Sequence, residues 1–427
     1  MNIVEHGRVF LESLRELADR TTWSWKRCPY CGSTLTIQNG SYVRQPWFFE
    51  GRRTVRVQRH LCHNCRKSYS ERVPELVGGS WYAREVQRAA IDHWLHLGTS
   101  LRRTAEVLRS WMGRQERWRM WRPLDDDTDE SCYLAASTVH RWLDGAGKKA
   151  KGTVPGQLAG IGQAQELGTD GLWAKLKGKA QRVVLLVVDS VTGLIYPPVV
   201  AQNEKSAESW QQAFERAQQA GLDLDGVRGV TSDGAQGLQA YLERGLEWAQ
   251  HQRCAWHLWR NLGAKLAQAA STAAQALNGE EAKQVRKRVC DELGKLIHGV
   301  VDAQSYDQAE AALAALRGHP QGAAIGNQLN VQLDQILAHQ LPYCQGLQRV
   351  SPEWYWRDFR QRLSHGRNHR TDQRLERAAL VWAIYHNFEP AQRRSERKRH
   401  YRHPGQSALQ VAGVPPGQVS YLDALGV

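Results

Sequence analysis

The central third of the chain has the clearest pattern of apolar and polar positions. Residues 166–173, 182–190 and 194–201 form three short apolar segments separated by turn residues, as expected for buried strands. An amphipathic helix is predicted over 206–221, and a further apolar strand over 226–231. Three strands, a helix and a fourth strand predict an α/β sheet with helices on its faces.

Helical spacing dominates the chain after the fourth strand. A helix carrying Leu238, Leu242 and Leu246 comes first, and one more short strand is predicted over 252–255. From there to residue 349, Ala, Leu and Gln recur at helical spacing without a strand signal. This stretch is predicted to be an all-α insertion into the α/β domain.

The stretch before the central sheet has the pattern of an interrupted helix-turn-helix. An apolar helical face begins at Tyr82, a turn follows at 98–100, and a second helical pattern starts at Leu101. The next helix is delayed by an insertion over 110–134, which is basic and Trp-rich at first and acidic afterwards. That capped helix would be the recognition helix, with the DNA-contacting residues Ser137, Thr138 and Arg141 on its leading turns. A three-helix packing domain is the alternative.

Two CxxC pairs near the amino terminus predict a metal site. They are formed by Cys28 and Cys31 and by Cys62 and Cys65, and a β-like stretch separates them. A pair at each end of a hairpin brings four thiolates to one point, which suits a structural Zn²⁺ ion. The long spacing favours a zinc ribbon with an extended hairpin. Two unrelated turns or a redox dithiol are the alternative.

Charge and composition point to a polyanionic partner. Lys and Arg outnumber Asp and Glu by 57 to 43, a net charge of +14, although a ribosome-associated or membrane-surface protein would also satisfy this balance. A basic run at 393–403 would add phosphate contacts or form a solvated tail. Trp354 and Trp356 would clamp a terminal base or pack a helix.

No apolar run is long enough to cross a bilayer and no secretory signal is visible, so we expect a cytoplasmic protein.

Two aspartates lie where strands of the predicted sheet bring them together. Asp170 falls on the first strand and Asp233 at the end of the fourth, each directly before a glycine. Neighbouring strands would place the two carboxylates side by side, and a divalent cation is the usual reason to keep both ionised. Two Mg²⁺ ions held there would serve an in-line displacement at phosphorus. Two turn-forming residues without chemistry are the alternative.

Together with two later motifs, these acids resemble a known family. The motifs are Thr169-Asp170-Gly171, Ser232-Asp233-Gly234, Cys254-x-x-His257 and the helix Arg370-Thr371-Asp372-Gln373-Arg374-Leu375-Glu376-Arg377. They resemble the Mutator-like superfamily of bacterial insertion-sequence transposases, from Glu166 to about Pro390. The resemblance implies an Asp-Asp-Glu active site on a ribonuclease-H-like fold, with Asp170, Asp233 and Glu376 as catalytic acids.

The resemblance also implies an activity. A DNA transposase would bind the terminal inverted repeats of its own element and catalyse metal-dependent strand cleavage and strand transfer. The three acids would hold two Mg²⁺ (or Mn²⁺) ions per active site, and the partners would be double-stranded element ends and target DNA, with no membrane and no small-molecule substrate. Pairing of two ends favours a homodimer or a higher oligomer. A transposase-derived DNA-binding regulator, or a nuclease of the same fold that cuts without joining, is the alternative.

Two assignments stay open within these motifs. The family usually has Asn where this chain has Asp372, and Ala378 to Leu380 stand where a second Asn is usual, so Glu389 is a rival third acid. Cys254 and His257 match the family's C-x-x-H element. We expect them to pack or to position substrate, because two ligands do not close a zinc site.

The expected domain order follows from these segments. It comprises a zinc ribbon (1–75), a helix-turn-helix region with its insertion (80–147), a linker (148–163), the first part of the ribonuclease-H-like core (164–262), the all-α insertion (263–350), closing helices with the third acid (351–392) and a basic tail (393–427). The linker assignment rests on a stretch that is rich in Gly and Lys and contains one Pro. This stretch begins at Gly145.

Overall fold

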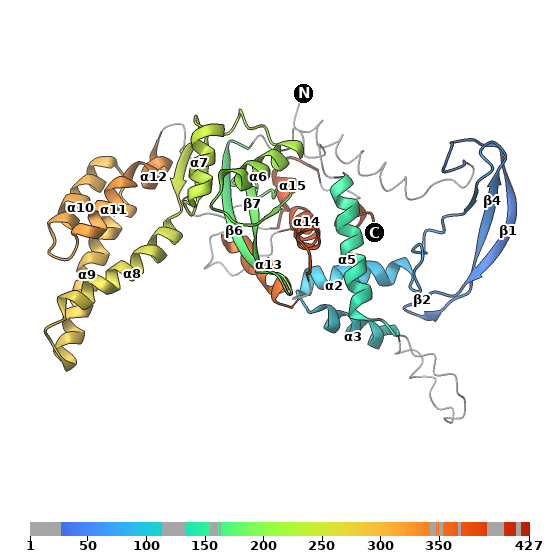
Figure 1. Cartoon of the computed structure of the whole chain (residues 1–427), viewed down its shortest axis with the longest axis horizontal. Helices are drawn as coiled ribbons and strands as arrows, with labels where there is room; N and C mark the ends of the chain where they lie inside the picture. The colour runs from blue at the N-terminus through green and yellow to red at the C-terminus, as the bar shows by residue number, and fades with distance from the viewer. Residues whose placement is uncertain are drawn as a thin grey trace. The chain divides into compact units, whose positions relative to one another are not determined.

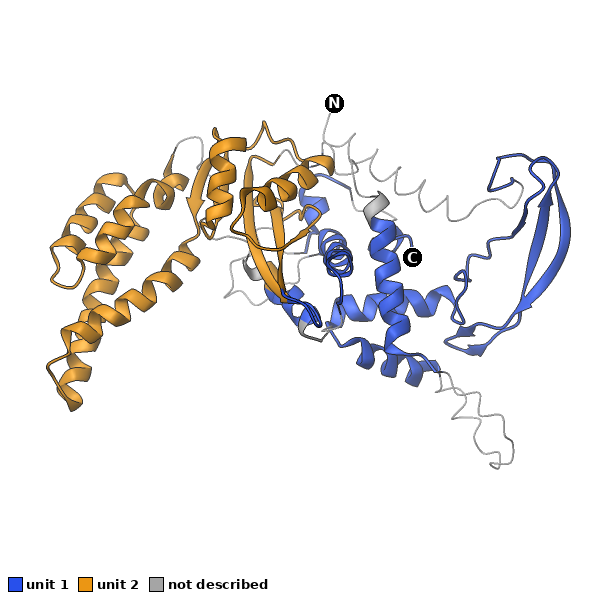
Figure 2. Ribbon diagram, viewed as in Figure 1, with its two compact units in different colours: residues 1–161, 175–180, 357–427 blue, residues 162–174, 181–356 orange. Residues whose placement is uncertain are grey.

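A computed structural model of the chain describes residues 27–112, 133–153, 161, 164–341, 347, 349, 353–365, 369–390, 405–415 and 420–427. The predicted basic run at 393–403 and most of the insertion at 110–134 lie outside these residues. The chain divides into two compact units (Figure 2). Unit 1 comprises residues 1–161, 175–180 and 357–427, and unit 2 comprises residues 162–174 and 181–356.

A five-stranded sheet forms the centre of unit 2 (Figure 1). Its strands are β6 (Glu166–Lys175), β7 (Gln181–Asp189), β8 (Val199–Ala201), β9 (Gly229–Ser232) and β10 (Gln250–Arg253). Their order in the sheet is β10-β9-β6-β7-β8. Strand β9 pairs in parallel with both β6 and β10, and β8 runs antiparallel to β7. The predicted mixed α/β architecture is confirmed.

The sequence explains why β7 lies inside the sheet. Its apolar run from Val183 to Val188 is buried throughout, as expected for a strand covered on both faces. Helix α6 (Ala207–Gln219) connects β8 to β9, and its Trp210 and Phe214 are buried. Helix α7 (Gln236–Gly245) connects β9 to β10. These connections match the predicted succession of strands and helices.

The rest of unit 2 is helical in its described residues. It consists of α8 (Ala255–Ala273), α9 (Gly279–Val301), α10 (Tyr306–Gly318), α11 (Ala323–Val331), α12 (Leu333–Leu337) and the 3-10 turn η1 (Ala338–Gln340). Helices α9, α10 and α11 lie side by side (Figure 1). Leucine and isoleucine side chains spaced at helical intervals, such as Leu293, Ile297 and Leu313, form one core. These residues are thus helical, and their standing as an insertion into the α/β domain stays a prediction.

The described part of unit 1 begins with a long antiparallel hairpin. Strands β1 (Thr36–Arg44), β4 (Val55–Cys62) and β5 (Ser68–Ser70) form a sheet in the order β1-β4-β5. The two-residue strands β2 (Trp47–Phe48) and β3 (Gly51–Arg52) form a second, small sheet. The two CxxC pairs therefore lie at the ends of an extended hairpin, as their spacing predicts.

Three helices follow the hairpin at the predicted positions. They are α2 (Arg84–Leu97), α3 (Leu101–Met112) and α5 (Ala136–Thr153). Gly98 ends α2 in a left-handed conformation, with φ of 58°, and its amide donates to the Trp94 carbonyl oxygen. The glycine turn thus sets the angle between the first two helices. A helix pair and a later third helix are present, and whether they bind DNA stays a prediction.

The predicted linker is wrong in its first part. Helix α5 continues through the Gly- and Lys-rich stretch to Thr153. Within it Ala146 and Ala150 are buried, and a Cβ atom at Gly147 would lie 2.6 Å from the Arg377 backbone oxygen. Small residues here permit close packing against another helix, so this glycine does not signal a flexible connection.

That second helix is α14 (Asp372–Phe388), which starts at the cap Thr371. Its Leu375, Ala379 and Trp382 are buried, and it packs against α5 within unit 1. The described part of the chain also contains α13 (Glu353–His365), α15 (Ala408–Val411) and α16 (Tyr421–Ala424). The helix with the expected third acid therefore groups with the amino-terminal elements, whereas the sequence analysis grouped it with the sheet.

None of the helices in the described ranges combines the length and the apolar character needed to cross a membrane. Trp356, on α13, is fully buried, which agrees with the helix-packing alternative for this residue. The side chain of Trp354 lies outside the described residues.

Candidate active site

The register of the sheet brings Asp170 and Asp233 together. Gly168 of β6 pairs with Thr231 of β9 in parallel, and each aspartate lies two residues beyond its member of this pair. Side chains two residues apart share one face of a strand, so both carboxylates reach the same place. Their oxygen atoms lie within 4.8 Å of each other and of a ring nitrogen of His257. The predicted juxtaposition of the two acids is present in unit 2.

Each aspartate is oriented by its own backbone. The Asp170 Oδ1 atom accepts from the Gly171 amide at 2.9 Å, and the Asp233 Oδ1 atom accepts from the Ala235 amide at 2.9 Å. Gly234 adopts φ of 78°, and the Arg253 guanidinium occupies the space that a Cβ atom there would need. A glycine after Asp233 is thus required by the turn and by this close approach.

Arg253 places one cation beside the acids. Its side chain is buried, with 8% exposed, and the Nε atom has no hydrogen-bond partner in the structure. Burial lowers the pKa of Arg253, while the nearby Asp233 carboxylate raises it. The guanidinium therefore offsets part of the negative charge of Asp233.

His257 reaches the acids from the first turn of α8. This helix starts directly after β10, which is parallel to β9, so its first turn lies near the ends of both strands. His257 is buried, and the Trp256 ring meets it edge-on at 4.7 Å. Cys254 is fully buried, and its amide donates to the Ser232 carbonyl oxygen at 2.7 Å. The structure thus places His257 in a group able to hold a metal ion, a role that we did not expect for it.

Glu204 is an acid near this site that the sequence did not single out. It lies in the loop between β8 and α6, and its Oε1 atom accepts from the Trp173 Nε1 atom at 3.2 Å. Its Oε2 atom contacts the position of a Cβ atom at Gly171, the neighbour of Asp170. Burial raises the pKa of Glu204, and so does the charge of Asp233, while His257 lowers it.

Three of these residues form a group of mixed donors, which we call the acid cluster: Asp170, Asp233 and His257. Carboxylate oxygens are preferred ligands of Mg²⁺ and Mn²⁺, and an imidazole nitrogen suits Mn²⁺ and later transition metals. Carboxylates at this separation repel one another unless a cation or a proton intervenes. The donor set therefore fits a divalent cation.

The third acid of the expected triad lies in unit 1. Glu376 is half-buried on α14, between the buried Leu375 and Arg377. The rival Glu389 ends the same helix, and its Oε1 atom lies 3.7 Å from the His96 Nε2 atom. Burial raises the pKa of Glu389, and the charge of His96 lowers it. Glu389 thus has an ion-pair partner within unit 1, and the assignment of the third acid to Glu376 stays a prediction.

Four cysteines of unit 1 converge as their spacing predicts. The Sγ atoms of Cys28 and Cys65 are 3.6 Å apart, and so are those of Cys31 and Cys62. Four sulfurs around a zinc ion at 2.3 Å would be separated by about 3.8 Å. Amide hydrogen bonds from Cys65 and Asn64 lower the pKa of Cys62 to about 6. The cluster is compatible with a structural zinc ion.

The predicted DNA-contacting residues lie on the accessible side of α5. Ser137 and Arg141 are exposed, and Thr138 accepts from the Arg141 guanidinium at 3.2 Å. The opposite side carries Val139 and Trp142, both buried. The helix therefore leaves these three residues available, and their contact with DNA stays a prediction.

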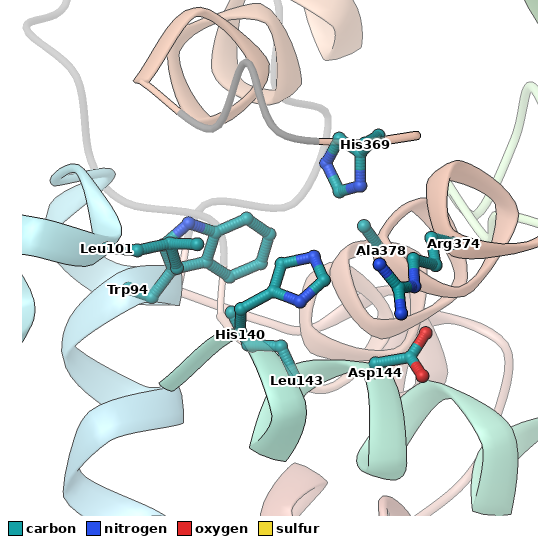
Figure 3. A pocket seen from close by; sticks show the side chains of 8 residues that line it. All are labelled: Trp94, Leu101, His140, Leu143, Asp144, His369, Arg374 and Ala378. Atoms are coloured by element: carbon teal, nitrogen blue, oxygen red, sulfur yellow. The ribbon is translucent and has the colours of Figure 1, made fainter. Parts of the chain in front are cut away.

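A second polar group, with two members on α5, lies around a small pocket (Figure 3). We call it the histidine cluster: His140, Asp144, His369, Arg374 and Arg377. The two imidazole rings lie 6.0 Å apart, and Arg377 donates to both oxygens of Asp144 at 3.0 and 2.9 Å. Burial lowers the pKa of His369 to about 4, helped by the charge of His140. The histidines are therefore neutral at pH 7.

Comparison with known proteins supports the resemblance found in the motifs. Residues 194–313 match the family described as "Transposase, Mutator family". The matched stretch includes Glu204, Asp233 and the C-x-x-H element. No curated protein matches the chain. The predicted resemblance to Mutator-like transposases is confirmed over this central stretch of the chain.

Proposed function

We propose that this protein is a DNA transposase that binds the terminal repeats of its own element and performs metal-dependent strand cleavage and strand transfer. The convergence of Asp170, Asp233 and His257 carries the proposal. Residues 194–313 of this unit, which include Asp233 and His257, match the Mutator family of transposases. An acid pair of this kind is suited to displacement at phosphorus.

The arrangement of the sheet supports a ribonuclease-H-like catalytic domain. The five residues between β6 and β7 allow only an antiparallel connection, and β8 continues antiparallel to β7. Strands β9 and β10 then run parallel to β6 on its other side. Three antiparallel strands followed by two parallel ones, with the first acid on the central strand, are the arrangement expected for that fold.

The acid cluster, with Glu376 as the expected third acid of the triad, would hold the divalent cations. When bound, two Mg²⁺ or Mn²⁺ ions would activate the attacking water or 3′-hydroxyl and stabilise the leaving oxygen. The protein's own groups orient this site: Gly171 and Ala235 donate amides that fix one oxygen of each aspartate. The Arg253 guanidinium keeps positive charge beside Asp233, where a DNA phosphate would enter.

Unit 1 would recognise the DNA sequence of the element ends. A zinc ion bound by the four cysteines would fix the hairpin, and Ser137, Thr138 and Arg141 would contact bases or phosphates in the major groove. Elemental analysis of the purified protein tests the metal part: about one zinc per chain is expected. A chain that folds and binds the ends without zinc would contradict it.

The test of the function is an assay of cleavage and joining. It uses the full chain, Mg²⁺ or Mn²⁺, and labelled DNA with the sequences that flank its own gene. Wild type should give nicked and joined products, and Asp233→Asn should lose both. Asp225→Asn is the matched control, because Asp225 is an exposed acid of the same unit.

Each other outcome rejects the proposal in a defined way. Specific binding to the ends without cleavage by wild type would indicate a DNA-binding regulator. Cleavage without joining would indicate a nuclease on the same fold. Cleavage that survives in Asp233→Asn would remove the acid cluster from the mechanism.

A further inference from the structure

We infer that the first turns of helix α8, beside the acid cluster, bind single-stranded DNA. The Trp256 indole stacks on an unpaired base, and the Arg260 guanidinium contacts a phosphate of the same strand. The inference deepens the proposed function, on which it rests, because it names the form in which DNA reaches the acids.

Trp256 is exposed directly beside the acid cluster. Its side chain keeps 44% of its surface exposed, whereas Trp210 and Trp382 are buried in the cores of the two units. The Trp256 ring meets the His257 ring edge-on, with 4.7 Å between their centroids. A ring nitrogen of His257 in turn lies within 4.8 Å of both aspartate carboxylates. A large exposed ring therefore lies one residue from a group of possible metal ligands, where a base could stack on it.

Arg260 lies over this ring from the next turn of the helix. Its guanidinium carbon is 4.7 Å from the Trp256 ring centroid, as the spacing of four residues along a helix permits. Both side chains are exposed. A guanidinium held against a ring at the surface suits a phosphate, and the ring suits the base attached to the same strand. The pair thus offers one contact for each part of a nucleotide.

The charge of α8 favours a polyanion as the occupant of this surface. The 19 residues of the helix include no acid, and Arg260 and Lys265 are exposed cations. The next helix, α9, carries acids at both of its ends, such as Glu280 and Glu292. Helix α8 starts at the sheet and leads away from it (Figure 1). A strand that lies along its first turns would meet no carboxylate of this helix before it reaches the acid cluster.

Stacking on Trp256 selects DNA that is locally unpaired. Inside a duplex both faces of a base are covered by the neighbouring bases, so a protein ring stacks only on a base that is unpaired or terminal. Aromatic stacking tolerates any base, because each base has a π face. The surface would therefore bind an opened strand at the acids without reading its sequence.

The test compares two labelled probes, oligothymidine and an abasic strand of the same length, by fluorescence anisotropy with the full chain and Mg²⁺. Both probes carry the same phosphates, and only oligothymidine carries bases. We expect Trp256→Ala to weaken oligothymidine binding about tenfold and to leave binding of the abasic strand within twofold of wild type. Trp256→Phe, which keeps an aromatic ring, should restore most of the lost affinity.

Trp248→Ala is the matched control for the ring. Trp248 is a tryptophan of unit 2 with a similar exposure of 48%, and it lies outside α8. Its replacement should leave the affinity for both probes within twofold of wild type. Thermal unfolding shows that each variant is folded.

Arg260→Gln tests the phosphate contact. It should weaken both probes by a similar factor and lower the slope of log Kd against log salt concentration by about 0.7, as expected for one phosphate contact on a single strand. Arg244→Gln, which removes an exposed cation at the far end of α7, should leave the slope unchanged. An unchanged slope in Arg260→Gln would contradict the assigned role of Arg260.

The results separate this inference from the proposed function. The inference is overturned where wild type does not bind oligothymidine, or where Trp256→Ala binds both probes as wild type does or loses both equally. A change in oligomeric state without a change in DNA binding would instead assign the surface to contact between copies of the chain. Selective loss of oligothymidine binding supports the inference, even where wild type fails to cleave its element ends and the transposase proposal falls. Normal cleavage by wild type with unchanged binding in Trp256→Ala would reject the inference alone.

Discussion

The acid cluster of unit 2 and the histidine cluster of unit 1 handle charge in opposite ways. In the histidine cluster, Asp144 and Arg377 neutralise each other with two hydrogen bonds, and burial keeps His140 and His369 uncharged. In the acid cluster, the like-charged carboxylates of Asp170 and Asp233 converge, and the Arg253 guanidinium lies beside Asp233. A structural cluster neutralises its own charges. A cluster that binds a cation keeps net negative charge, which the bound cation neutralises.

This difference predicts opposite effects of the same substitution. Replacing an aspartate by asparagine in the acid cluster removes repulsion and should stabilise the metal-free fold while it abolishes chemistry. The same replacement in the histidine cluster leaves a guanidinium without its partner and should cost stability while chemistry persists. The pattern is typical of functional sites, which retain strain that the rest of the fold avoids.

The largest effect is expected for Asp170→Asn. Loss of a cation ligand removes several kcal/mol of transition-state stabilisation, so the rate of strand cleavage should fall on the order of 10³-fold. The free energy of unfolding without metal should rise by about 1 kcal/mol, because repulsion from Asp233 is relieved. Cleavage kinetics and chemical denaturation in EDTA measure the two quantities. A variant that is less stable and still active would contradict the comparison.

A smaller effect, on stability alone, is expected for Asp144→Asn. The pair with Arg377 is about three-quarters buried on each side, so its loss should lower the free energy of unfolding by about 2 kcal/mol. Glu106→Gln is the control, because it breaks the exposed pair with Arg103 and should change stability by less than about 0.5 kcal/mol. Equal losses in both variants would show that burial does not distinguish the two pairs.

The sequence predicted the elements that carry strong local patterns. The apolar run of β7, the glycine turn at Gly98 and the two CxxC pairs each specify their structure within a few residues. Asp170 and Asp233 were found because each falls at a defined place on a predicted strand. The order of strands then follows from rules of connection, so a large part of the sheet and both aspartates of the acid cluster could be predicted.

The parts that were missed depend on tertiary packing. Glu204 lies in a loop before a capped helix, and only the folded sheet brings it to Gly171. His257 was assigned to packing because its partners are distant in sequence. Gly147 suggests a flexible linker by composition, yet it permits contact between α5 and α14. Helix α14 has no signal in its own residues that assigns it to unit 1.

The smallest effect expected concerns acid pH and His369. Its pKa of about 4 lies below the ordinary value of 6.5, so the folded state binds fewer protons than the unfolded state between these values. Stability from this group is complete above pH 6.5 and is lost as the pH falls toward 4. At pH 5.5 the loss should be about 1 kcal/mol relative to pH 7.5. Neighbouring groups, His140 and Asp144 on α5 and Arg374 on α14, contribute to the total.

His369→Gln isolates this contribution. The variant should be less dependent on pH than wild type between pH 7.5 and 5.5, and denaturant unfolding at several pH values measures the difference. His298→Gln is the control, because that histidine is exposed in unit 2 and pairs with Asp302. Suppose that the free energy of unfolding depends on pH in the same way for wild type and His369→Gln. His369 would then be protonated as readily in the folded protein as in the unfolded chain. The histidine cluster would then not exclude charge, and this contrast with the acid cluster would be lost.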